Sequence, residues 1–168
     1  IAFESYEPTR AGRLIQKFVI SDLSNWYVRL CRKRFWKGEL NSDKIAAYDT
    51  LFICLKNISL LMSPIAPFYS DLLYRDLTKK QESVHLASFP ESLTNLINLE
   101  LEHKMDLSQR ISSLVLSIRK KEKIKVRQPL NRILIPSEGN NFETAINDVK
   151  SLILSEVNVK DLTFIEKN

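Results

Sequence analysis

The side chains whose chemistry stands out in this sequence are two clusters of cations. The first basic cluster comprises Arg29, Arg32, Lys33, Arg34 and Lys37, with no acidic residue between positions 29 and 37. The second basic cluster comprises Arg119, Lys120, Lys121, Lys123, Lys125 and Arg127, with Glu122 among them. Clustered cations suit the phosphate backbone of a nucleic acid. They are also typical of solvated helix ends, because Lys and Arg favour the last turn of a helix.

Aromatic residues alternate with cations in the segment 22–36, which favours RNA among the nucleic acids. Trp26 and Tyr27 are flat surfaces on which unstacked bases can stack, and guanidinium planes can do the same. Trp26 also lies on the apolar stripe of the predicted helix, so a core position is the competing interpretation. The candidates that leave this stripe near the helix end are Arg32, Lys33, Arg34 and Trp36.

Residue types that carry catalysis or bind metals are sparse and dispersed. His85 and His103 have no neighbours at metal-ligand spacing, and two cysteines cannot complete a four-ligand zinc site. Asp71 and Asp76 are not spaced to share a helix face. Three glycines are too few for a phosphate-cradling loop. We therefore expect no catalytic residue, no metal site and no cofactor in this chain.

The composition is that of an ordinary globular protein. The chain has 168 residues, 44% of them hydrophobic and 27% charged, with a net charge of +5. This length fits one domain, or one domain with a small appendage. No uninterrupted apolar run approaches the roughly 20 residues that span a bilayer. The chain opens at Ile1 without a start methionine or a targeting segment, so we expect it to be a piece of a longer protein.

Helical periodicity dominates residues 1–128. Apolar residues recur at spacings of three and four, and we expect long helices at 8–36 with a bend at 21–24, at 43–62 and at 92–121. A short helix from Phe68 to Leu77 follows Pro67. The sequence thus predicts a mainly α fold, with a helical bundle over residues 1–128.

The pattern changes after Pro129. Residues 132–135 form a compact apolar run, residues 142–153 have helical periodicity, and residues 157–164 suggest one or two closing strands. We therefore expect a small α/β (β-α-β) subdomain over residues 129–168. Acidic residues outnumber cations from position 136 onward, so the positive charge is concentrated in the bundle and its exit.

Four segments resemble isoleucyl-tRNA synthetases, and they occur in the order of that family. Residues Asp22–Trp36 resemble the first helix of the anticodon-binding domain. Leu61–Phe68, continuing to Asp71–Tyr74, resembles the helix-breaking segment shared by class I synthetases for aliphatic amino acids. Ser83–Pro90 and Arg119–Leu130 resemble the following loop and the basic exit from the last long helix. The Asn-Trp-Tyr-Val-Arg and Lys-Val-Arg-Gln-Pro-Leu runs favour isoleucyl over valyl or leucyl enzymes.

The resemblance implies a tRNA-binding function without catalysis. The intact enzyme of that family activates isoleucine with ATP and Mg²⁺, transfers it to tRNA(Ile) and hydrolyses misacylated valyl-tRNA. The signatures of those reactions are absent here. The implied partners are the anticodon arm of tRNA(Ile) and the catalytic domain of the same polypeptide, in a cytoplasmic monomer that needs no membrane. The resemblance also leans towards family members with a longer C-terminal tail.

The resemblance and the two basic clusters together give a set of expected tRNA contacts. Residues Asn25, Trp36, His85 and Gln128 are candidates for reading bases, since phosphate contacts carry no sequence information. The full set of predicted tRNA-binding residues is Arg29, Arg32, Lys33, Arg34, Trp36, Lys121, Lys125, Arg127 and Gln128. The alternative is a helical scaffold whose basic ends dock acidic surfaces of other protein domains. An independent enzyme is disfavoured, because no acid–base or metal cluster is present.

Overall fold

The computed structural model describes residues 2–79 and 82–166. The chain folds as two compact units, residues 1–92 (unit 1) and 93–168 (unit 2). The predicted domain boundary between residues 128 and 129 remains a prediction, because a compact unit need not coincide with a domain. The mainly α fold class with a small C-terminal α/β element is confirmed, because the chain has seven α-helices and one two-stranded sheet within the described residues.

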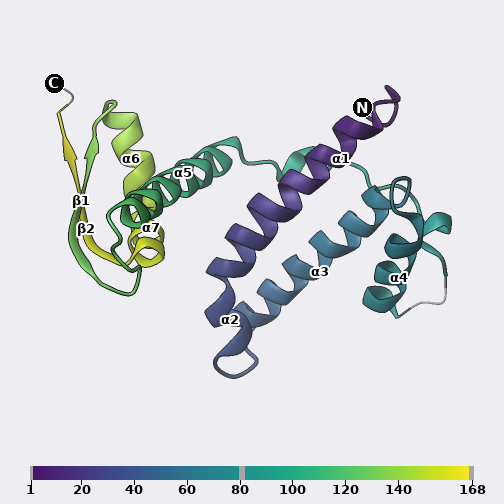
Figure 1. Cartoon of the computed structure of the whole chain (residues 1–168). Helices are drawn as coiled ribbons and strands as arrows, with labels where there is room; N and C mark the ends of the chain where they lie inside the picture. The colour runs from purple at the N-terminus through teal and green to yellow at the C-terminus, as the bar shows by residue number, and fades with distance from the viewer. Residues whose placement is uncertain (1, 80–81, 167–168) are drawn as a thin grey trace. The chain divides into compact units, whose positions relative to one another are not determined.

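Unit 1 is a set of helices that runs out and back (Figure 1). α1 (Pro8–Lys17) continues as a π-helix over Phe18–Val28, and α2 (Arg32–Trp36) follows. α3 (Ser42–Met62) returns alongside, and α4 (Pro67–Thr78) packs against it. A 3₁₀ turn, Val84–Leu86, closes the unit.

The helix predicted over 8–36 is therefore not one uniform α-helix. The bend predicted at 21–24 lies inside the π-helix, whose wider turns rotate side chains relative to an α-helix. Cys31, with ψ near 0°, interrupts the helix before α2. α3 begins at Ser42, close to its predicted start, because the Asn41 side chain accepts a hydrogen bond from the Lys44 N–H at 2.8 Å.

Within the described residues one helix, α3, is long and apolar enough to cross a membrane by length and composition. α3 does not contain an uninterrupted apolar run, because Asp49 and Lys56 lie within it. A bundle helix meets the same criterion, and α3 contacts α1, α2 and α4. We therefore assign α3 to the helical bundle of unit 1.

Unit 2 packs one long helix against a small parallel sheet and its two connecting helices. A 3₁₀ turn, Thr94–Leu96, precedes α5 (Leu99–Lys121), and the sheet pairs β1 (Leu130–Pro136) with β2 (Val159–Ile165). α6 (Asn140–Asp148) and α7 (Lys150–Val157) form the crossover between the strands. The β-α-β expectation is confirmed, with its single predicted helix broken into two at Val149.

The start of α5 differs from the predicted position 92. The Asn98 side chain accepts a hydrogen bond from the Leu101 N–H at 3.0 Å and caps the helix there. The core of unit 2 consists of Ile146, Val149, Ile153 and Leu162, joined by a second cluster of Val115, Val157 and Val159. α5 thus contributes its buried face to the sheet side of the unit, and its C-terminal end leads into the loop before β1.

Candidate nucleic-acid interface

The first basic cluster lies on and around α2, which aromatic contacts attach to the π-helix and to α3. Phe35 is buried, and its ring centroid lies 6.4 Å from that of Tyr27 and 5.1 Å from that of Tyr48. The Tyr48 hydroxyl donates to the Phe35 carbonyl at 3.1 Å, and the Tyr27 hydroxyl donates to the Ala47 carbonyl at 3.0 Å. Burial raises the pKa of Tyr27, which keeps this hydroxyl a donor. These contacts fix the single turn that carries the cations.

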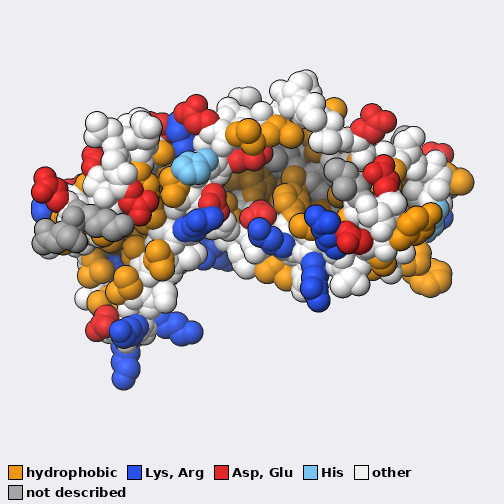
Figure 2. Space-filling model, turned by 90° about the horizontal axis from the view of Figure 1, so that it is seen from above, with side chains coloured by type: hydrophobic (Ala, Val, Ile, Leu, Met, Phe, Trp, Pro, Cys, Tyr) orange, Lys and Arg blue, Asp and Glu red, His pale blue; other side chains and the backbone are white. Residues whose placement is uncertain are grey.

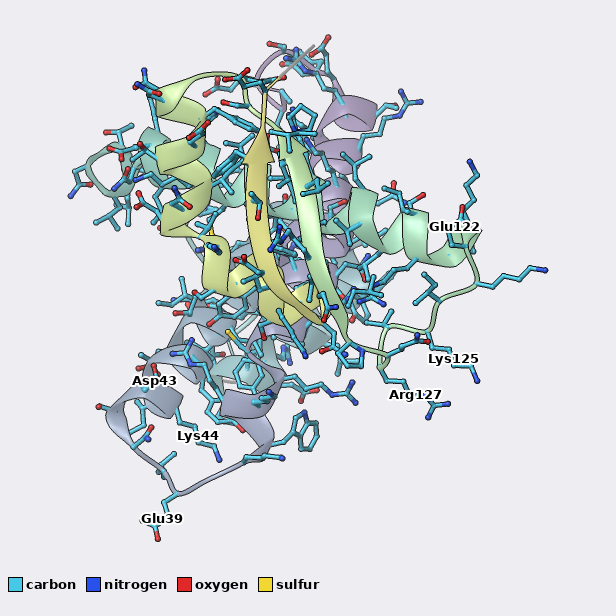
Figure 3. The ribbon with its side chains drawn as sticks, turned by 90° about the vertical axis from the view of Figure 1, so that its left-hand side faces the viewer. Glu39, Asp43, Lys44, Glu122, Lys125 and Arg127 are labelled. Carbon is cyan, nitrogen blue, oxygen red and sulfur yellow. The ribbon has the colours of Figure 1, made fainter. Side chains whose placement is uncertain are left out.

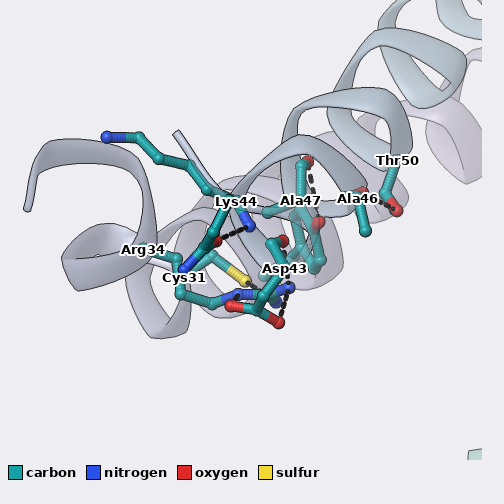
Figure 4. Close-up of polar contacts among 9 residues, drawn as sticks. Cys31, Arg34, Asp43, Lys44, Ala46, Ala47 and Thr50 are labelled. Carbon is teal, nitrogen blue, oxygen red and sulfur yellow. Dashed lines mark hydrogen bonds and ion pairs between the residues drawn. The ribbon is translucent and has the colours of Figure 1, made fainter. Parts of the chain in front are cut away.

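Arg34 differs from its neighbours because its guanidinium is engaged within the protein (Figure 4). Nε and Nη2 donate to the two carboxylate oxygens of Asp43 at 2.8 and 2.7 Å, and Nη2 also donates to the Asp43 carbonyl at 2.8 Å. Nη1 lies 3.4 Å from the Cys31 sulfur. The Asp43 carboxylate raises the pKa of Arg34. Arg34 therefore ties α2 to the first turn of α3, and a phosphate would have to share it with Asp43.

The other predicted residues of α2 face solvent. Arg32 and Lys33 are exposed, and within residues 2–79 and 82–166 neither side chain has a hydrogen-bond or ion-pair partner. Trp36 is 81% exposed although it follows the buried Phe35. Arg29 is exposed at the end of the π-helix and makes a contact of its own. The structure thus brings Arg32, Lys33 and Trp36 together on one exposed turn.

The second basic cluster surrounds the end of α5 and the loop of residues 122–129, here called the basic loop. Lys121, Lys123, Lys125 and Arg127 are exposed, and Gln128 is exposed beside them. Figure 3 shows the Lys125 and Arg127 side chains pointing outward from this loop. Lys and Arg side chains project from unit 2 at the lower left of Figure 2. The predicted residues Lys121, Lys125, Arg127 and Gln128 therefore share one end of unit 2.

Arg119 is the member of the second cluster that does not face solvent. It is 2% exposed, and its guanidinium donates to the carbonyls of Lys125, Gln128 and Asn158. Counting cations along the sequence places Arg119 with its neighbours and misses this internal role. The buried positions Ser108, Ser112 and Val115 lead to it at helical spacing, so the burial pattern of α5 is the signal that identifies it.

The remaining base-reading candidates, Asn25 and His85, both belong to unit 1. Asn25 is exposed on the π-helix. His85 is exposed on the 3₁₀ turn of unit 1, where its backbone N–H donates to the Ser83 hydroxyl. Trp26 is half-buried, and its Nε1 is buried without a hydrogen-bond partner among the described residues. The part of the chain that the structure describes has no group of three or more His, Cys, Asp or Glu side chains that could hold a metal ion.

Comparison with known proteins places this arrangement in a family. The sequence model of the family described as "Anticodon-binding domain of tRNA ligase" matches residues 1–134. The chain is 58% identical over 170 residues to isoleucine–tRNA ligase of Cytophaga hutchinsonii, which covers 98% of the chain and 15% of that protein. It is 53% identical over 161 residues to isoleucine–tRNA ligase of Porphyromonas gingivalis, with 96% of the chain and 14% of that protein covered.

A more distant relative extends the same match. Isoleucine–tRNA ligase of Thermoplasma acidophilum is 42% identical over 167 residues, which cover 99% of the chain and 16% of that protein. The chain thus spans about 15% of the length of the curated relatives that it matches. The resemblance to isoleucyl-tRNA synthetases is confirmed, and the chain belongs to the family of anticodon-binding domains of tRNA ligases, as the part that isoleucine–tRNA ligases carry.

Proposed function

We propose that this chain binds the anticodon arm of tRNA(Ile) and positions the tRNA for aminoacylation by parts of the ligase outside these residues. The observation that carries the proposal is the basic loop, where Lys123, Lys125 and Arg127 are exposed while the backbone beneath them is hydrogen-bonded inward. Cations held in this way can contact successive phosphates without reorganising. ATP and Mg²⁺ would serve the catalytic parts of the same enzyme.

The second basic cluster is the proposed phosphate-binding surface of unit 2. Lys121, Lys125 and Arg127 would each neutralise a phosphate and release condensed counterions, which makes binding salt-dependent. Gln128 lies at the end of the same loop, with an amide able to donate to a base edge and accept from one. Contacts of this kind would combine positioning by phosphates with some discrimination between bases.

The exposed turn of α2 is the proposed contact surface of unit 1. Trp36 presents nearly its whole ring to solvent, and an unstacked anticodon-loop base could stack on it, a contact worth about 1–3 kcal/mol. Arg32 and Lys33 lie on the same turn and would contact neighbouring phosphates. Arg29 and Arg34 remain in the proposal as secondary contacts, since both already interact within the protein.

The remainder of the polypeptide is the proposed protein partner, reached through α4. Phe68 is 91% exposed, and Tyr69 and Leu72 are also exposed. Leu72 follows Phe68 by four residues and Tyr69 by three, so it lies on the same helix face as each of these two residues. Orange side chains mark exposed apolar groups at the right of Figure 2, where the α4 part of unit 1 lies. Contiguous exposed apolar groups typically mark a protein contact. The relatives are about seven times longer than this chain. We propose that the rest of the ligase polypeptide packs against this surface, and that the ligase is a cytoplasmic monomer.

The test is a titration of the whole ligase with the anticodon stem-loop of tRNA(Ile) at several salt concentrations. The variant Lys121→Ala/Lys125→Ala/Arg127→Ala should bind more weakly, with a salt slope shallower by about 1 per lost phosphate contact. The double variant Arg110→Ala/Lys160→Ala removes two other exposed cations of unit 2 and is the control for a loss of charge alone.

Two results would contradict this proposal. One is an unchanged affinity and salt slope in the triple variant. The other is equal binding of the wild-type ligase to an unrelated hairpin of the same length. The scaffold alternative is not favoured, because the matching family is described by anticodon binding.

A further inference from the structure

We propose that buried Arg119 is a positioning residue that holds the basic loop in the conformation that meets RNA. This inference rests on the proposed function of the loop, and it concerns a side chain that itself reaches no solvent. It assigns one cation of the second basic cluster to shaping the surface and leaves the others to contact phosphates.

The hydrogen bonds of Arg119 converge on the loop from inside unit 2. Nη1 donates to the Gln128 carbonyl at 3.0 Å and to the Lys125 carbonyl at 3.3 Å, and Nη2 donates to the Asn158 carbonyl at 2.9 Å. Two of these acceptors belong to the loop and the third belongs to the residue before β2. One guanidinium thus fixes both ends of the loop's second half against the sheet.

Asn158 completes this arrangement from the other side. Its side-chain Nδ2 donates to the Val126 carbonyl at 2.9 Å, and its own carbonyl accepts from the Leu130 N–H at 3.2 Å as well as from Arg119. Asn158 has a φ of 52°, a left-handed conformation that asparagine tolerates better than most residues. The carbonyls of Lys125, Val126 and Gln128 are thus all bonded to Arg119 or Asn158, while the side chains of Lys125 and Arg127 are exposed.

The first half of the loop is fixed by the backbone of Arg119 itself. The Ile124 N–H donates to the Arg119 carbonyl at 2.8 Å, and the Lys123 N–H donates to the Lys120 carbonyl at 3.2 Å. This pair of bonds is a Schellman motif, which ends a helix with one left-handed residue. That residue is Lys123, with a φ of 56°. Arg119 therefore organises the loop through its carbonyl and through its guanidinium.

A planar guanidinium is the side chain that this geometry requires. Three carbonyls accept from Nη1 and Nη2 of Arg119, while Nε is buried without a hydrogen-bond partner and no hydrogen-bonded carboxylate accompanies the guanidinium among the described residues. Burying a cation without a counter-ion opposes folding unless donors are well satisfied. A lysine ammonium is a point donor and cannot reproduce the fixed fork that spans the loop and Asn158.

The test compares Arg119→Lys and Arg119→Met with Arg110→Lys and Arg110→Met in the whole ligase. Arg110 lies on the same helix but is exposed and paired with Asp106, so its variants are the matched control. We expect both Arg119 variants to speed amide hydrogen exchange at Ile124 and Gln128, whose N–H groups donate to the carbonyls of Arg119 and Lys125. We also expect a roughly tenfold loss of affinity for the anticodon stem-loop, with a salt slope shallower by about 1 although no exposed cation is removed.

A milder variant keeps the proposal testable if the Arg119 variants fail to fold. Asn158→Gly preserves the left-handed backbone and the carbonyl that Arg119 uses, but it removes the hydrogen bond to Val126. It should loosen the loop and weaken RNA binding less than Arg119→Lys does. Faster exchange with unchanged RNA affinity and salt slope would overturn the positioning role, as would weaker binding without any change in exchange.

The outcome separates this inference from the proposed function. The variant Lys121→Ala/Lys125→Ala/Arg127→Ala removes charges without touching Arg119. If that variant loses affinity while the folded Arg119 and Asn158 variants bind normally, the loop contacts RNA but does not need Arg119 to shape it. If the triple variant also binds normally, the proposed phosphate contacts themselves are wrong.

Discussion

The Arg34 guanidinium holds the Asp43 carboxylate through two nearly parallel hydrogen bonds of 2.8 and 2.7 Å, which close the turn between α2 and α3. The Lys44 Nζ donates to the Gly38 carbonyl across the same turn, with 3.2 Å between the two atoms. A fork-to-fork pair of this kind sets geometry as well as energy. Arg34 and Asp43 thus join α2 to the first turn of α3, in addition to the aromatic contacts that fix Phe35.

The first prediction concerns this ion pair. Asp43→Asn should lower the free energy of unfolding by at most about 1 kcal/mol, because the pair is largely exposed. The same substitution frees the Arg34 guanidinium, so RNA affinity should stay level or rise. A double-mutant cycle with Arg34→Lys, followed by thermal unfolding and stem-loop titration, measures both effects. A large loss of affinity in Asp43→Asn would show that the pair positions the α2 turn for RNA.

The second prediction separates stability from binding at Lys123. A non-glycine residue at its φ of 56° costs roughly 1 kcal/mol, so Lys123→Gly should stabilise the end of α5 by about that amount. The same change removes an exposed cation and should weaken stem-loop binding. Chemical denaturation and titration of one preparation check the two signs together. Lys123→Asn, which also tolerates the left-handed region, is the control. A variant that is less stable than the wild type would contradict the assigned conformation.

The third prediction concerns acid sensitivity in unit 1. The Ser83 hydroxyl and the Val84 N–H both donate to one Asp71 oxygen, at 2.6 and 2.9 Å, and Arg75 pairs with the other oxygen. These hydrogen bonds hold the pKa of Asp71 below its usual 3.8. The bond from Ser83 has the largest effect, and the bond from Val84 has the next largest. Because the folded-state pKa is depressed, this stabilisation is present above the unfolded pKa and is lost as pH falls through the folded value.

Asp71→Asn therefore should flatten the decline of stability below about pH 4, the range where an unfolded carboxyl takes up its proton. Denaturation midpoints measured from neutral to acidic pH, for the wild type and the variant, check this dependence. Asp76→Asn, on the same helix, is the control. An identical acid slope in wild type and Asp71→Asn would contradict the assigned role of the Asp71 carboxylate.

The fourth prediction concerns the exposed ring of Trp36. Trp36→Ala should weaken binding of the anticodon stem-loop by about 1–3 kcal/mol if a base stacks there, and Trp36→Phe should restore part of that loss. Thermal stability should remain within about 0.5 kcal/mol, since an exposed side chain contributes little packing. Equal binding by all three proteins would remove Trp36 from the interface.

Local pattern predicts the elements of this chain better than it predicts the roles of its cations. Periodicity and turn residues are short-range signals, and they identify α3, α4 and the β-α-β order correctly. Arg34 and Arg119 look like their neighbours in sequence. Their partners lie farther away, at Asp43 and at Asn158, so only the folded chain distinguishes them.

The predicted start of α5 and the predicted single crossover helix are wrong for a similar physical reason. α5 begins at Leu99 because the Asn98 side chain caps it, although apolar spacing extends back towards residue 92. The crossover helix breaks at Val149, whose backbone leaves helical geometry while its side chain joins the core of unit 2. In both places a specific side-chain or packing contact outweighs a continuous helical pattern.

The most direct test of the central claim is a footprint of full-length tRNA(Ile) on the whole ligase, with and without the side-chain charges of Lys121, Lys125 and Arg127. We predict that the wild type protects the anticodon arm, and that Lys121→Ala/Lys125→Ala/Arg127→Ala loses part of that protection while the acceptor stem remains protected. Anticodon-arm protection that is unchanged in the variant, or absent from the wild type, would contradict the account.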